Sequence, residues 1–208
     1  MKPVRRDRPN PPSQTQPNPW GEVLKVVGLS LFMSLGIRHF IAEARYIPTE
    51  SMVPTLQVND HLVVEKLSYR FHDPARGDVV VFMPREDLQA QNPDFRFAFI
   101  KRVIGLPGET VQVINGQVLI NGQPLDEPYI AAEPTYVWGP AVVPDDAYLV
   151  LGDNRNNSLD SHFWGYVPRE TIIGRAAVRF WPPDRLGSVN PNLLYPDDVN
   201  QQLVDEGR

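Results

Sequence analysis

The stretch Thr110-Val-Gln-Val-Ile-Asn-Gly-Gln-Val-Leu-Ile120 decides the class of fold. Two short runs rich in Val and Ile flank Asn115-Gly116, which is the preferred dipeptide for the two-residue type I′ turn between antiparallel strands. We therefore predict a β-hairpin with strands at 110–114 and 117–120. A second turn, at Asn121-Gly122, follows directly.

Outside this hairpin, further short runs of branched and aromatic residues predict more strands, bounded by polar or turn residues. The segment at 84–96 is polar and is predicted to leave the sheet, and residues 123–145, with five prolines, are predicted to form a long loop over it. The chain shows no internal repeat. We predict a single mainly β domain over residues 43–182. Its other strands are expected at Leu62–Val64, Asp78–Met83, Phe97–Ile104, Ala147–Leu151 and Ile172–Trp181.

The N-terminal region changes character twice. Residues 1–22 are rich in proline and carry the basic residues Lys2, Arg5, Arg6 and Arg8, a composition typical of a disordered tail. Residues 23–42 are long enough to cross a hydrocarbon core of roughly 30 Å as a helix. We predict a transmembrane helix there.

Two other interpretations of the same helix stay open. Its uncharged centre, residues 26–37, is short enough for a helix that lies in the membrane interface. Ala42-Glu43-Ala44 also resembles a small-x-small cleavage site, so the helix could belong to a cleaved signal peptide or the chain could process itself there. Under the favoured interpretation, the N-terminal arginines keep residues 1–22 in the cytoplasm and place everything after Ala42 on the far side. Residues 183–208 are predicted to be a polar surface tail.

Composition limits the chemistry. A net charge of −5 gives no indication of a nucleic-acid surface. The absence of cysteine excludes a disulfide, a thiol nucleophile and a cysteine metal site. The four histidines (His39, His61, His72 and His162) lack metal-ligand spacing. We predict neither a metal nor a cofactor.

Ser51 is the first candidate for chemistry. It lies between Pro48 and Pro54, which exclude a helix interior and are expected to hold the segment near extended geometry. A serine on such a stiff segment can act as a nucleophile if a base lies near it. Taken alone, the stretch is also ordinary loop composition.

Lys101 is the candidate base. It lies in an apolar predicted strand, where alternation puts it on the same face as Phe97 and Phe99. Burial among aromatic rings lowers the pKa of an ammonium group, and a fall of about two to three units would give a neutral amine near pH 8. Such an amine can take the proton of a serine hydroxyl. The alternative is an ordinary lysine that faces water.

Four segments together resemble the type I signal peptidases, membrane-bound serine proteases that remove signal peptides. They occur in the family's order behind an N-terminal membrane segment, and the resemblance covers roughly residues 23–181. The segments are Pro48–Leu56, Arg76–Phe82, Phe99–Glu109 and Gly152–Gly165. The resemblance implies a signal-peptidase-like antiparallel β-barrel or sheet.

The resemblance also implies a role for each matching residue. Ser51 matches the nucleophile and Lys101 the general base, with the Ser51 backbone N–H and the Thr49 hydroxyl as the oxyanion hole. Ser158 matches the serine that orients the base. Asp153, Arg155 and Asp160 match polar residues that brace the site.

Two positions depart from the family's pattern. Thr49 stands where many members have serine, and His162 stands where many have arginine, which would make any ion pair with Asp160 pH-dependent.

The implied substrates are the signal peptides of exported precursors, cut after small residues in an Ala-x-Ala pattern and bound as an extended strand. Candidate pocket residues are Ile47, Met52, Leu56, Phe99, Ile100 and Val150, each of which could equally be core. The implied partners are the lipid bilayer and the secretion translocon. The implied location is the cell or thylakoid membrane.

Two other functions fit part of the sequence. A Ser-Lys self-cleaving repressor shares the Ser-Met motif, but it should carry a basic DNA-binding domain where this chain has an apolar segment. A catalytically inactive, membrane-anchored β module that binds exported chains would need no Ser51. The favoured prediction is a membrane-bound signal peptidase I, a serine endopeptidase.

Overall fold

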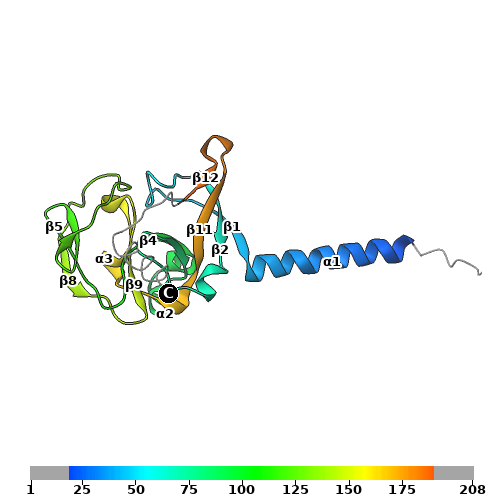
Figure 1. Cartoon of the computed structure of the whole chain (residues 1–208), viewed down its shortest axis with the longest axis horizontal. Helices are drawn as coiled ribbons and strands as arrows, with labels where there is room; N and C mark the ends of the chain where they lie inside the picture. The colour runs from blue at the N-terminus through cyan, green and yellow to red at the C-terminus, as the bar shows by residue number, and fades with distance from the viewer. Residues whose placement is uncertain (1–18, 190–208) are drawn as a thin grey trace, which may run out of the picture.

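The computed structural model describes residues 19–189, and Figure 1 shows one long helix that projects away from a β-rich body. The basic cluster of the N-terminal tail and residues 190–208 lie outside the described residues. Within the described part, one helix, α1 (Pro19–Phe40), precedes the β strands.

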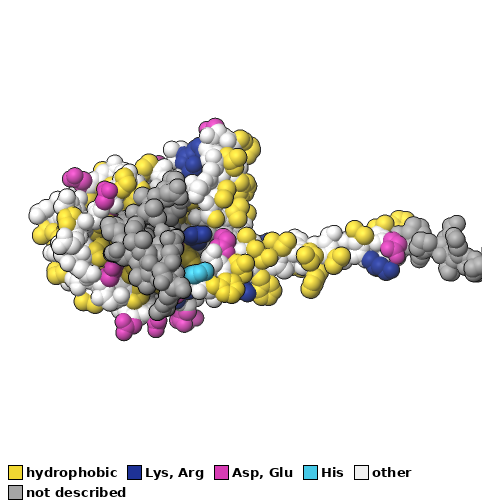
Figure 2. Space-filling view, in the orientation of Figure 1, with side chains coloured by type: hydrophobic (Ala, Val, Ile, Leu, Met, Phe, Trp, Pro, Cys, Tyr) yellow, Lys and Arg dark blue, Asp and Glu magenta, His cyan; other side chains and the backbone are white. Residues whose placement is uncertain are grey.

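Helix α1 is 22 residues long, or about 33 Å at 1.5 Å per residue. By length and composition Trp20–Phe40 could cross a membrane, and none of it is buried against the body. Its apolar side chains are visible along its length in Figure 2. The predicted bounds, 23–42, are wrong at both ends. Proline at the first helical position favours the earlier start, and the backbone from Ala42 onward pairs with another strand.

The larger sheet has eight strands, and every pairing in it is antiparallel. Its hydrogen-bonded order is β1-β2-β11-β3-β4-β9-β10, and β12 pairs with β11. The strands are β1 (Ala42–Tyr46), β2 (His61–Glu65), β3 (Val79–Phe82), β4 (Phe99–Gly105), β9 (Ala147–Leu151), β10 (Val167–Pro168), β11 (Ile172–Trp181) and β12 (Gly187–Ser188). The five strands predicted for this region are confirmed, and β1, β10 and β12 are additional.

The smaller sheet contains the predicted hairpin. Its order is β7-β6-β5-β8, made of β5 (Thr110–Ile114), β6 (Gln117–Ile120), β7 (Gln123–Pro124) and β8 (Trp138–Val142). Asn115 and Gly116 have φ of 52° and 78°, as a type I′ turn requires. Both β7 and β8 lie in the segment 123–145 that was predicted as a loop. That prediction was wrong because Pro124 and Pro140 are tolerated on the two edge strands of this sheet.

Short helices fill the connections. The polar segment at 84–96 does leave the sheet, as α2 (Glu86–Gln91) and the 3₁₀ turn η2 (Pro93–Arg96). The others are η1 (Ser68–Arg70), η3 (Arg155–Asn157), α3 (Ser161–Trp164), η4 (Arg169–Thr171) and η5 (Pro183–Arg185).

One core cluster packs the segment around Ser51 against strands β2, β3 and β11. It consists of Ile47, Met52, Leu56, Leu62, Val79, Ala176 and Val189. Val189 is only 1% exposed, and β12 precedes it. Residues 183–189 therefore belong to the β domain rather than to a polar tail, because the side chain of Val189 is buried in this core.

Candidate active site

Ser51 and Lys101 meet in a buried position. Lys101 Nζ lies 2.8 Å from Ser51 Oγ and 2.9 Å from the carbonyl oxygen of Ile100. The two side chains come from positions 50 residues apart, one in the turn segment after β1 and the other in β4. Their exposed fractions are 8% and 4%. A hydroxyl and an amine are thus held in direct contact, largely shielded from water.

The segment that carries Ser51 is a turn rather than the predicted extended stretch. The Leu56 backbone N–H donates to the Met52 carbonyl (2.8 Å), and residues 51–55 are turn residues. Pro48 and Pro54 restrict φ to a value that turns also use, which explains why the extended prediction was wrong. Met52 and Leu56 are fully buried below the turn. These two apolar side chains anchor the segment and leave Ser51 facing Lys101.

Strand β4 presents Lys101 to the serine. Its cross-strand neighbour in β3 is Val80, and its Nζ lies 5.7 Å from the centre of the Phe99 ring, on the predicted face. Phe97 lies outside the strand and is 73% exposed, so only one of the two predicted aromatic neighbours is present. Burial lowers the pKa of Lys101 to about 8, although the negative charges of Asp160 and Asp153 partly oppose that shift.

The two hydroxyl groups expected beside Ser51 and Lys101, called the dyad below, make different contacts. Thr49 Oγ1 lies 3.3 Å from Ser51 Oγ. Ser158 Oγ is buried but has no hydrogen-bond partner among the described residues, so the expected hydrogen bond to Lys101 is absent. Ser158 packs against Gly152, where an added Cβ would lie 2.2 Å from Ser158 Oγ and 2.4 Å from the Ser51 carbonyl oxygen. Only glycine fits there, a requirement that the sequence alone did not reveal.

Asp153 forms a buried ion pair with Arg102. The guanidinium group donates to both carboxylate oxygens, at 2.8 and 2.6 Å, and also to the Gly77 carbonyl. The Thr55 hydroxyl donates to the same carboxylate at 2.5 Å. Because Thr55 follows Ser51 in the same turn segment and Arg102 lies in β4, these contacts connect the Ser51 segment to β4. Arg102 and Thr55 were not predicted, although an arginine within an apolar strand was a usable signal.

Arg155 and Asp160 hold the loop that follows β9. Arg155 donates to both carboxylate oxygens of Glu127, at 2.5 and 2.7 Å, and to the Gly152 carbonyl. Asp160 accepts the Gly152 N–H at 2.9 Å and lies 2.7 Å from His162 Nδ1. The Asn154 N–H in turn donates to the Ser51 carbonyl. The loop after β9 therefore also contacts the backbone of Ser51.

The six candidate pocket residues divide into two groups. Met52, Leu56 and Val150 are fully buried, and Ile47 is nearly so, because all four pack in the apolar core. These four offer a bound peptide almost no surface, which corrects their assignment to a pocket. Phe99 and Ile100 are partly exposed next to Lys101, so they can still contact a substrate.

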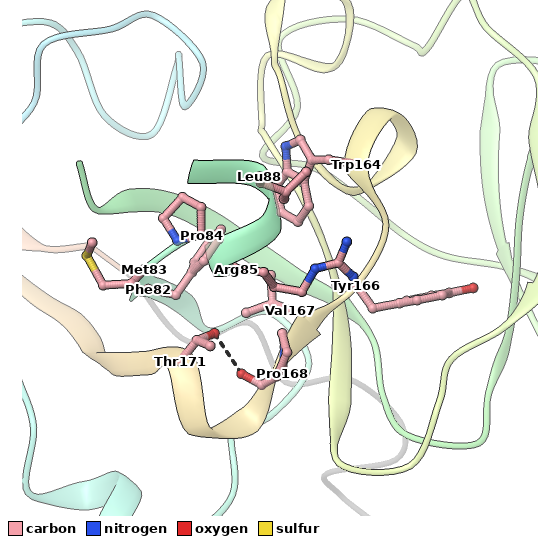
Figure 3. Close-up of a pocket in the computed structure, with 10 residues that line it drawn as sticks. All are labelled: Phe82, Met83, Pro84, Arg85, Leu88, Trp164, Tyr166, Val167, Pro168 and Thr171. Carbon is pink, nitrogen blue, oxygen red and sulfur yellow. Dashed lines mark hydrogen bonds between the residues drawn. The ribbon is translucent and has the colours of Figure 1, made fainter. Parts of the chain in front are cut away.

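A separate crevice lies at the far end of β3 and includes neither member of the dyad. Figure 3 shows its lining, in which the Thr171 hydroxyl donates to the Pro168 carbonyl. In the described part of the chain, no three His, Asp or Glu side chains gather into a metal site.

Comparison with known proteins identifies the family. The family model described as "Signal peptidase, peptidase S26" matches residues 20–181. The chain is 63% identical to "Signal peptidase I" of Leptolyngbya laminosa, over 93% of this chain and 97% of the relative. It is 53% identical to "Probable signal peptidase I-2" of Synechocystis, over 99% and 88%. It is 37% identical to "Probable thylakoidal processing peptidase 2, chloroplastic" of Arabidopsis thaliana, over 87% and 48%.

These matches cover nearly the whole β domain together with helix α1, which is compatible with a membrane anchor. Their names agree on one activity, and substrates of that activity are precursors that carry signal peptides. The chain belongs to the signal peptidase family S26 and is a serine endopeptidase that removes signal peptides.

Proposed function

We propose that Ser51 is the nucleophile of this peptidase and Lys101 its general base, acting after small residues in an Ala-x-Ala pattern. The contact of 2.8 Å between Nζ and Oγ is the observation that carries the proposal. Proton transfer needs a hydrogen bond of this length and a base with a pKa near the working pH. A pKa of about 8 for Lys101 meets the second condition.

The proposed reaction has two halves. Neutral Lys101 accepts the hydroxyl proton of Ser51 as Oγ attacks the carbonyl carbon of the scissile bond, and the resulting ammonium then donates that proton to the departing amine. In the second half, water attacks the acyl-enzyme with Lys101 again as base. The ester bond to Oγ breaks, and Ser51 regains its proton.

The negative oxygen formed in each half needs donors. We assign this role to the backbone N–H of Ser51 and the hydroxyl of Thr49, whose Oγ1 lies 3.3 Å from Ser51 Oγ. Donors of this kind are each worth about 10²–10³ in turnover. Ser158, whose buried hydroxyl has no hydrogen-bond partner in the described part of the chain, remains available to orient Lys101 once substrate is bound.

We further propose that the enzyme works at the membrane surface as a single-pass protein. In this arrangement the N-terminus is cytoplasmic and the β domain lies on the periplasmic or lumenal side of a cell or thylakoid membrane, beside the translocon. Ser51 lies eleven positions after Phe40 in the chain, a reach of at most roughly 40 Å. Confinement to the surface where precursors emerge raises their effective concentration.

The test is a pH–rate profile of the detergent-solubilised enzyme on an Ala-x-Ala precursor peptide. We expect kcat/KM to rise with pH through a midpoint near 8, because only the neutral amine is a base. Lys101→Ala and Ser51→Ala should each lose turnover, and Ser51→Ala should still bind the peptide. His162→Ala should keep much of the activity, since its ring contacts Asp160 rather than Ser51. Loss of activity in His162→Ala with retention in Lys101→Ala would reassign the base.

A further inference from the structure

An exposed carboxylate adjoins the buried dyad. Glu50 lies between Thr49 and Ser51 in the chain, and its side chain is exposed whereas Ser51 and Lys101 are buried. Consecutive Cα atoms are 3.8 Å apart, so the carboxylate cannot lie far from any bond that Ser51 attacks. A peptide bound at Ser51 would therefore lie within a few residues' length of this carboxylate.

The loop after β9 holds Glu50 in place. Asn154 Nδ2 donates to the Glu50 carbonyl at 3.2 Å, and Asn157 Nδ2 donates to its Oε2 at 3.5 Å. Both contacts are to neutral amides, which leave the charge of the carboxylate intact. None of the ion pairs between described residues includes Glu50.

The other two acidic groups near the dyad are buried. Asp153 is ion-paired with Arg102, and Asp160 accepts the Gly152 backbone N–H. Above pH 8 Lys101 is largely neutral. Glu50 then presents an exposed carboxylate next to the dyad in the chain, and the field of such a charge extends over about the Debye length, about 8 Å at physiological salt.

We propose that Glu50 is a specificity-determining residue that favours precursors with a basic side chain within about three residues of the scissile bond and disfavours acidic ones there. The limit of three residues is set by distance, because three extended residues span about 10 Å, which is close to the Debye length. This inference rests on the assignment of Ser51 as the nucleophile.

The experiment measures kcat/KM for two sets of Ala-x-Ala peptides. In one set the residue x is Lys, Gln or Glu, and in the other the second residue after the cut is varied in the same way. The wild-type enzyme, Glu50→Gln and Glu50→Lys are compared at pH 8.5. Glu170→Gln serves as the control, because it removes an exposed glutamate from η4, outside the site.

For the wild type we expect the Lys peptide to be preferred over the Glu peptide in at least one set. Glu50→Gln should reduce that ratio by about two- to fivefold, the range for exposed charge pairs, and Glu50→Lys should reverse it. About 0.5 M salt should shrink the wild-type ratio, and Glu170→Gln should leave it unchanged. A ratio that is the same in all three Glu50 forms, in both sets, overturns the inference. Undiminished cleavage by Ser51→Ala would instead overturn the assignment of the nucleophile.

Discussion

Burial of Lys101 has two consequences at the scale of the single residue. It lowers the pKa of the amine to about 8, which supplies a base near neutral pH, and it places a charged group in an apolar site at any lower pH. The hydrogen bonds to Ser51 Oγ and the Ile100 carbonyl compensate only part of the lost hydration. The feature proposed to make the residue catalytic should therefore reduce the stability of the fold.

Lys101→Met should stabilise the protein at pH 7. A folded pKa of about 8 against the ordinary value of 10.5 corresponds to a cost of about 3 kcal/mol for the charged form. The unfolded chain binds the extra proton between these two pKa values, so the cost is complete below pH 8 and disappears as pH rises toward 10.5. Thermal or chemical unfolding of both forms in detergent, at pH 7 and 10.5, measures the difference.

A suitable control is Lys66→Met, because Lys66 is ion-paired with Glu43 rather than desolvated in an apolar site. This variant should not gain stability. A wild-type protein as stable as Lys101→Met at pH 7 would mean that the amine is well solvated in the folded state.

At the scale of secondary structure, the sequence predicted those elements whose own residues favour them. The Asn115-Gly116 hairpin and strand β11 have the predicted bounds, because turn chemistry and runs of branched residues determine them locally. Strand β1 was missed, since Ala42-Glu43-Ala44 has low strand propensity and becomes a strand by pairing with β2.

The site divides in the same way. Ser51 and Lys101 were singled out from residue type and resemblance, and the structure places their side chains in contact. The supporting contacts were not foreseen, because they join segments that are distant in the chain. Thr55 reaches Asp153 across 98 positions, and Arg102 reaches the same carboxylate across 51. Such pairings depend on the tertiary structure rather than on any local pattern.

Arg102 and Asp153 should each stabilise the fold only when the other is present. Arg102→Met leaves a fully buried carboxylate without its counter-charge, which typically costs about 3–5 kcal/mol. The double variant Arg102→Met/Asp153→Leu should recover much of that loss, because two apolar side chains replace two buried charges. Unfolding measurements on the wild type, both single variants and the double variant give the coupling energy. Additive losses would show that the two charges do not depend on each other.

At the scale of the whole molecule, the proposed membrane anchor would determine where the chemistry takes place. Helix α1 projects from the β body, and β1 continues from it almost directly (Figure 1). The apolar side chains of α1 are exposed. The basic residues that precede the helix favour a cytoplasmic N-terminus. The β domain would then lie on the opposite side of the membrane, where exported precursors emerge.

Labelling of introduced cysteines can test this orientation, because the natural chain contains none. Ser13→Cys and Glu133→Cys place a single thiol before α1 and on the exposed surface of the β domain, respectively. In spheroplasts of a bacterial host, whose inner membrane is intact, a membrane-impermeant maleimide should label the Glu133→Cys protein. It should label the Ser13→Cys protein only after the membrane is opened. The opposite pattern would place the peptidase domain in the cytoplasm, and labelling of both thiols without opening the membrane would favour a helix that does not span it.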